Sequence, residues 1–276
     1  MSSSRIPSTA ERGLRATVKV VAGAADLVRR PASGVVILLY HRVGAGTHSS
    51  VDLPAGMFDE QMAALAATGK VVALGDGLDA LDSEPDGARI AVTFDDGTAD
   101  LVDVALPILV RHGIPSTWYL ATSFIDEQRP FESGRALTWS AVREACSTGL
   151  VSIGSHTHRH RLLDRAPEAD VVDELDRSIG SIGDNLGAAP SDFAYPKALL
   201  GSTAAQTAVR CRFRSAALAG TRANVAGKTD VYRLARSPIQ VNDGRVWFER
   251  KVAGGMSFEH TMREVVNRLR YAKAST

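Results

Sequence analysis

The sequence predicts an α/β protein built around a parallel sheet. Continuous apolar runs such as 35–40, typical of strands buried on both faces, alternate along the chain with segments of helical periodicity. Acidic residues and histidines follow directly after several of these runs, where the carboxyl ends of parallel strands place functional sites. These two observations do not by themselves distinguish a closed barrel from an open, doubly wound sheet.

The elements are expected in the following order. Strands are predicted at 35–40, 71–74, 89–94, 116–120, 150–154, 193–195, 212–218 and 232–239, and a polar connection at 78–86. Helices are predicted at 59–68, 98–112, 138–146, 170–186, 202–210 and 262–269. Thr138 is expected to cap the start of one helix and Gly113 the end of another.

Composition favours an ordinary globular protein. The chain has 276 residues, of which 45% are hydrophobic and 23% charged, and its net charge of +1 gives no reason to expect nucleic acid as a partner. We expect an N-terminal tail and helix over residues 1–33 and one catalytic domain over residues 34–276. Cys146 and Cys211 are too few for a disulfide framework and are expected to be reduced.

The N-terminal segment 14–29 has an apolar stripe at helical spacing. Lys19 and Asp26 interrupt the apolar stretch, which is too short to span a membrane and has no convincing cleavage site after it. We expect an amphipathic helix packed on the domain, with peripheral contact of residues 14–29 with a membrane surface as the alternative. A cytoplasmic location follows from this interpretation.

Asp95 and Asp96 stand at the end of a buried strand. Adjacent carboxylates repel each other, so a cation or a proton-transfer task is expected beside them. His156 and His160 follow a second strand and are four residues apart, which would place both imidazoles on one side of a helical turn. One aspartate and these two histidines would form a three-ligand catalytic metal site with an open position. The alternatives are an Asp-Asp-Gly turn that caps a helix and two surface histidines.

These residues also carry a family resemblance. Thr-Phe-Asp-Asp-Gly at 93–97, followed by Ser-His-Thr-x-x-His at 155–160, resembles the first two motifs of the polysaccharide deacetylase family, and the likeness covers roughly residues 34–240. The resemblance implies a distorted (β/α) barrel of about seven parallel strands. It also implies that Asp96, His156 and His160 hold one divalent metal ion and that Asp95 is the general base. Zinc is expected, with cobalt, nickel or manganese as alternatives.

The remaining family motifs are displaced or degenerate. A Leu-x-Leu-x-His pattern, which in many members lies near the C-terminus and supplies the general acid, matches only the strand that ends before His41, in a permuted order. In the third motif Lys197 replaces the tyrosine of the family. Tyr195 and Lys197 are assigned to substrate or oxyanion positions, where the backbone N–H of Lys197 would be the donor. The arginine that steers the base is missing from that motif, and its role is assigned to Arg233 or Arg236.

The resemblance implies a hydrolase that removes N-acetyl groups from a glycan or glycoconjugate containing N-acetylhexosamine. A catalytically inactive glycan-binding relative and an O-acetyl esterase are the alternatives. Two histidines and one carboxylate are also typical of non-haem iron oxygenases, although there the ligands usually lie close in sequence and here about sixty residues separate them.

Overall fold

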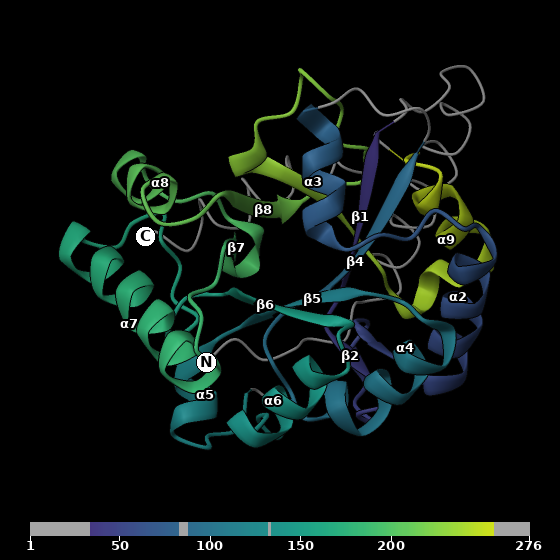
Figure 1. Ribbon diagram of the computed structural model, residues 1–276, viewed down its shortest axis with the longest axis horizontal. Helices are drawn as coiled ribbons and strands as arrows, with labels where there is room; N and C mark the ends of the chain where they lie inside the picture. Colours follow the sequence, from purple (N-terminus) through teal and green to yellow (C-terminus); the bar gives the residue numbers. More distant parts are fainter. Residues whose placement is uncertain (1–33, 83–87, 132–133, 257–276) are drawn as a thin grey trace.

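The structure, a computed structural model, describes residues 34–82, 88–131 and 134–256. Seven parallel strands form a closed barrel in chain order, and the last strand closes the ring by pairing with the first (Figure 1). The strands are β1 (Val35–Tyr40), β4 (Arg89–Phe94), β5 (Ser116–Leu120), β6 (Val151–Ser155), β7 (Asp192–Ala194), β8 (Ser215–Ala219) and β9 (Leu234–Pro238). The prediction of a (β/α) barrel of about seven parallel strands is confirmed, and an open, doubly wound sheet is excluded.

Strand β1 lies at the point where the barrel closes. All six of its residues are buried, since β4 pairs with one edge and β9 with the other. Tyr40 lies opposite Phe94, and Ile37 lies opposite Arg236. This register brings the residues that follow β1 and β4 to the same rim of the barrel.

Helices surround the barrel and connect its strands. They are α2 (Ala55–Ala67), α3 (Leu74–Asp82), α4 (Leu106–His112), α5 (Thr122–Asp126), α6 (Trp139–Ser147), α7 (Glu168–Leu186), α8 (Thr203–Arg210) and α9 (Gly244–Val252). Shorter turns are the π-helical η1 (Leu101–Ala105) and the 3-10 helices η2 (Pro196–Ala198), η3 (Val231–Arg233) and η4 (Val241–Asp243). A separate two-stranded sheet joins β2 (Arg42–Val43) to β3 (Asp52–Leu53).

An aromatic cluster fills the space between the sheet and helix α2. The ring of Tyr40 meets that of Phe58 edge-on with 5.3 Å between centroids, and Phe94 lies 5.5 Å from Tyr40. Trp118 extends the cluster to β5, 6.2 Å from Phe94. These side chains alternate with residues that face the barrel interior, as the two-residue period of a strand requires, so the packing fixes the register of β1, β4 and β5.

Several predicted boundaries are confirmed. The Thr138 hydroxyl accepts a hydrogen bond from the N–H of Ala141 at the start of α6. Gly113 ends α4 with φ of 63°, a left-handed conformation that favours glycine. The cysteine prediction also agrees with the structure, in which Cys146 and Cys211 are both free thiols.

Two predictions of secondary structure are wrong, and two helices were not predicted. Segment 71–74 contributes only an isolated bridge from Val71 to Ile90. The predicted polar connection at 78–86 is described as far as residue 82, and all of that part belongs to helix α3. Glycines at 75 and 77 weaken the helical pattern of α3, which forms because Leu74, Leu78 and Leu81 pack in the core. Helices α5 and α9 were not predicted, since one is a single short turn and the other is mostly polar.

The predicted helices at 14–29 and 262–269 lie outside the described residues. Among the helices that are described, none is both long and apolar enough to cross a membrane.

Candidate metal centre

Strand β4 delivers two carboxylates to the rim of the barrel. The N–H of Asp95 donates to the carbonyl of Tyr40 at 3.1 Å, which extends the β1–β4 pairing by one residue. Asp96 then adopts a φ of 78° and Gly97 a φ of 88°. Two successive left-handed residues turn the chain sharply, and a non-glycine residue persists in that region only when its surroundings hold it there.

The two histidines lie on the loop that follows β6. The expectation that they share one turn of helix is wrong, because segment 156–160 is irregular and both Thr157 (φ 64°) and His160 (φ 57°) are left-handed. This loop still brings the imidazole rings of His156 and His160 to 4.9 Å between centroids. Their proximity comes from the fold of the loop and not from helical periodicity.

Asp96, His156 and His160 converge on one point. Their potential ligand atoms all lie within 4.8 Å of one another, and no other group of this kind occurs among the residues that the structure describes. Oδ1 of Asp96 is 3.7 Å from Nε2 of His156 and 3.5 Å from Nε2 of His160. One carboxylate and two imidazoles form a donor set that fits a divalent metal and leaves a coordination position open.

The protein environment leaves His156 and His160 in a form that could bind a metal ion. Nδ1 of His156 lies 2.8 Å from the carbonyl of Ala194, which can only accept, so this nitrogen carries the proton and Nε2 presents its lone pair. Burial is the largest of the effects that lower the pKa of His160 to about 2. Burial also lowers the pKa of His156, against the opposing charge of Asp95. Both imidazoles are therefore neutral near pH 7, as metal binding requires.

Asp95 is held by a buried arginine. Nη1 and Nη2 of Arg236 donate to its two carboxylate oxygens at 2.6 Å and 2.8 Å, and the arginine side chain is fully buried. Burial alone would raise the pKa of Asp95, but the charge of Arg236 and its hydrogen bonds outweigh this effect and lower the pKa to about 2. Asp95 is thus ionised and fixed in orientation, with Oδ2 3.8 Å from Nε2 of His156.

Arg236 rests on an aromatic ring inside the barrel. Its guanidinium carbon lies 5.0 Å from the ring centroid of Tyr119, a cation–π contact in a site without access to solvent. Gly154, on the neighbouring strand, makes room for this ring, since a Cβ there would lie 2.4 Å from a Tyr119 ring carbon. Sequence reasoning missed Tyr119, because a tyrosine within an apolar strand gives the same signal as any core residue.

His41 lies close enough to Asp95 and Arg236 for their charges to affect its pKa. It follows Tyr40 directly, as Asp95 follows Phe94, and these two preceding residues are paired across β1 and β4. Burial lowers the pKa of His41 to about 4, and although Asp95 opposes this effect, Arg236 adds to it. The imidazole is therefore neutral near pH 7.

The other predicted site residues are placed differently. Lys197 is exposed at the end of β7, and its charge contributes to the lowered pKa values of His156 and His160. Tyr195 is buried with its ring edge-on to Phe193, within a core cluster beneath α8. Arg233 is half exposed and donates to Gln206, so the structure brings Arg236 to Asp95 and does not bring Arg233 there.

A further aromatic residue borders the site. The ring of Phe131 meets that of His160 edge-on, with 4.9 Å between centroids and an interplanar angle of 85°. The carbonyl of Phe131 accepts a hydrogen bond from Arg42, which is buried on the strand that follows His41. No motif in the sequence signalled Phe131, because it lies in a loop.

Comparison with known proteins finds a family match over the part of the chain that carries both motifs. Residues 82–216 match the family described as polysaccharide deacetylase. Among curated proteins, a poly-beta-1,6-N-acetyl-D-glucosamine N-deacetylase of Staphylococcus aureus is 28% identical over 117 residues, which are 40% of this chain and 40% of that protein. The match therefore spans less than half the length of either.

Solved structures share the fold over most of the chain. IcaB from Ammonifex degensii aligns with a TM-score of 0.69 at 22% identity and covers 81% of this chain and 97% of its own. The Streptococcus pyogenes deacetylase PplD in complex with acetate aligns with a TM-score of 0.71 at 22% identity, over 80% and 99% of the two chains. At such identities the likeness concerns the fold of the barrel.

Proposed function

The chain belongs to the polysaccharide deacetylase family, and on this premise we propose that it is a metal-dependent hydrolase that removes N-acetyl groups from a glycan containing N-acetylhexosamine. The observation that carries the proposal is the convergence of Asp96, His156 and His160 beside the ionised carboxylate of Asp95. The name of the Staphylococcus aureus relative supports N-acetylglucosamine as the sugar.

The three ligands suit a catalytic metal better than a structural one. A divalent ion held by them would supply Lewis acidity for the hydrolysis, since three protein ligands leave a coordination position open. Zinc is our proposal for the metal, because the donor set combines two imidazoles with a carboxylate.

Asp95 is proposed as the general base. The two hydrogen bonds from Arg236 leave further lone pairs on both carboxylate oxygens, and one of these can accept a proton from the attacking water. Because Arg236 holds the carboxylate in one orientation, little reorganisation is needed when the proton moves. The low pKa of Asp95 ensures that it is ionised over the whole neutral range.

His41 is proposed as the group that protonates the departing amine. In the resting site it is neutral, because its pKa is lowered to about 4. Negative charge that develops on the carbonyl oxygen of the substrate during attack would raise this pKa, so that His41 can take up the proton that Asp95 has removed from the water and pass it to the departing nitrogen. The backbone N–H of Lys197 is proposed as a second stabilising donor for the same oxygen.

Acetate release from short N-acetylglucosamine oligomers tests the proposal. The protein is stripped of metal with a chelator and then reloaded with zinc or cobalt, and release is expected only after reloading. His160→Gln should abolish it, whereas His112→Gln should not, because His112 pairs with Asp59 on helices α4 and α2, away from the metal ligands. Metal binding without acetate release would favour an inactive glycan-binding relative.

Two variants test the roles of the proton-transfer residues. Asp95→Asn should lose nearly all turnover and still bind metal, and an unchanged rate would contradict its role as base. His41→Ala should slow cleavage of the amide more than cleavage of an activated acetyl ester, whose leaving group needs no proton. Equal losses on both substrates would contradict the role of His41 as acid.

A further inference from the structure

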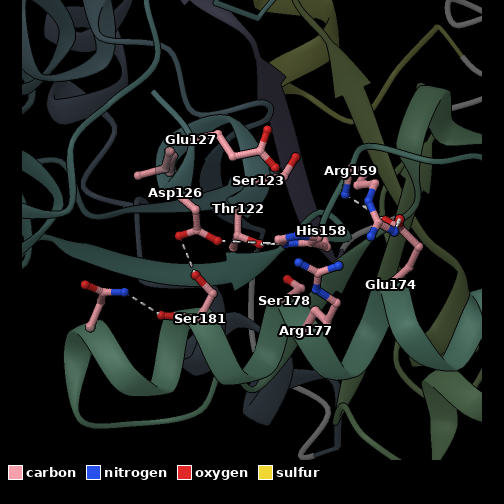
Figure 2. A network of polar contacts seen from close by, with 12 residues as sticks. Thr122, Ser123, Asp126, Glu127, His158, Arg159, Glu174, Arg177, Ser178 and Ser181 are labelled. Atoms are coloured by element: carbon pink, nitrogen blue, oxygen red, sulfur yellow. Dashed lines mark hydrogen bonds and ion pairs between the residues drawn. The ribbon is translucent and has the colours of Figure 1, made fainter. Parts of the chain in front are cut away.

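A buried carboxylate on helix α7 contacts the loop that carries both histidines. Glu174 has no exposed surface, and its Oε2 accepts a hydrogen bond from the backbone N–H of Arg159 at 2.7 Å (Figure 2). Its Oε1 accepts from Nη1 of Arg159 at 3.1 Å. The backbone carbonyl of Glu174 accepts from the N–H of His158 at 3.1 Å. All three bonds end on residues between the two histidine ligands.

The same face of helix α7 also contacts the start of the loop that carries the two histidines. Ser178, one turn after Glu174, lies with its hydroxyl 2.7 Å from that of Ser155, the residue before His156. The hydroxyl of Ser155 also accepts from the N–H of Thr157 at 3.3 Å. Helix α7 therefore contacts the chain on both sides of His156.

Helix α5 supports the loop from another direction. Nδ1 of His158 lies 2.9 Å from the hydroxyl of Thr122, and the carbonyl of His158 accepts from the N–H of Ser123 at 2.8 Å (Figure 2). His158 itself is buried and is not among the converging ligand atoms. Its Nδ1 faces α5 and not the point on which Asp96, His156 and His160 converge.

The stability of the fold alone does not explain why the carboxylate of Glu174 is buried. A fully buried carboxylate is expensive to desolvate, and an apolar side chain at such a helix position is often at least as stabilising. The loop, however, contains two left-handed residues that are not glycine, Thr157 and His160. Such conformations persist only when surrounding contacts determine them, and Glu174 provides acceptors at the middle of that segment.

We propose that Glu174 is a positioning residue that preorganises His156 and His160 and thereby sets the affinity of the site for a divalent metal. This inference rests on the metal site of the proposed function. Glu174 does not contact the metal ligands' ring atoms; it acts through the Arg159 and His158 peptides that separate them in the chain.

Cobalt binding to metal-free protein tests the inference. We compare Glu174→Ala and Glu174→Gln with Asp173→Ala, a matched control. Asp173 accepts from the same Nη1 of Arg159 at 3.0 Å, but it is exposed and does not bond the loop backbone. The Kd for Co²⁺, measured by calorimetry or visible absorbance, should rise about 10- to 100-fold in the Glu174 variants, as is typical when a partner outside the ligand shell is lost.

The Asp173→Ala control and the Glu174→Gln variant distinguish a positioning role of Glu174 from a general loss of stability. Asp173→Ala should leave the Kd for Co²⁺ within about twofold of wild type, because exposed ion pairs contribute little. If Glu174→Ala does not fold, Glu174→Gln, which preserves the size of the side chain, still gives the comparison. A lowered melting temperature with an unchanged Kd would overturn the inference. Absence of Co²⁺ binding by the wild type would instead overturn the metal site itself.

Discussion

Replacing Arg236 by methionine should separate the ionic role of this residue from its bulk. Methionine keeps much of the side-chain volume in a position that is fully buried but removes both hydrogen bonds to Asp95. The carboxylate would then remain buried without its main counter-charge. We expect a large loss of stability, and a loss of deacetylase turnover because the proposed base is no longer oriented.

The pKa of Asp95 gives a lower limit for the size of this effect. It lies at about 2, against 3.8 for an ordinary aspartate, even though burial acts in the opposite direction. That difference corresponds to a net stabilisation of the carboxylate by about 2 kcal/mol. Removing one partner of a buried ion pair typically costs about 3–5 kcal/mol, because the remaining charge is left unpaired. We therefore expect Arg236→Met to lower the free energy of unfolding by about 3–5 kcal/mol.

A double-mutant cycle measures the coupling directly. Urea unfolding of wild type, Arg236→Met, Asp95→Asn and the double variant is followed with chelator present, so that bound metal does not contribute. The double variant should be more stable than the sum of the single losses predicts, by at least about 2 kcal/mol. Arg212 and Asp176 form a two-pronged pair at the surface, at 2.5 Å and 3.0 Å, and their cycle should give about 1 kcal/mol or less. Additivity at Arg236 and Asp95 within about 0.5 kcal/mol would refute the reasoning.

The remaining predictions concern acid stability and packing. Since the folded-state pKa of Asp95 is depressed, its contribution is complete above pH 3.8 and is lost as the pH falls through about 2, so the stability difference between wild type and Arg236→Met should shrink over that range. Gly154→Ala should lower the free energy of unfolding by about 1–3 kcal/mol, because the new methyl group would meet the Tyr119 ring at 2.4 Å and a backbone oxygen at 2.9 Å; an unchanged melting curve would contradict this. Lys251→Met should lower the free energy of unfolding by about 3–5 kcal/mol, since the buried Lys251 ammonium donates to both oxygens of Asp243 at 2.9 Å. An unchanged free energy of unfolding in chemical denaturation would contradict this prediction.

Much of the fold could be predicted from local sequence. The apolar run of β1, the alternation of strands and helices, and the cap at Thr138 are properties of neighbouring residues, and the structure confirms them. The carboxylates at 95–96 and the histidines at 156 and 160 could be located for the same reason. Each group directly follows a strand, and the ends of parallel strands meet at one rim.

The groups that orient Asp95 and His156 could not be predicted from local sequence. Arg236 is 141 residues from Asp95 in the chain, and the carbonyl that orients His156 is 38 residues away. Sequence alone left Arg233 and Arg236 as equal candidates, although they differ completely in burial. Only the register of β9 against β1 places one of them beneath Asp95.

Two features show why tertiary contacts prevail over local pattern. The four-residue spacing of the histidines indicated a helical turn, yet hydrogen bonds from α7 hold the segment in a loop with left-handed residues. Glu174 belongs to a residue type that is mostly exposed, yet it is buried because the loop offers it two donors. The sequence by itself determined where the carboxylates and histidines of the candidate site lie, at the ends of their strands. Closure of the barrel decided which distant side chains pair with them, since buried charges are stable only where the assembled fold supplies a partner.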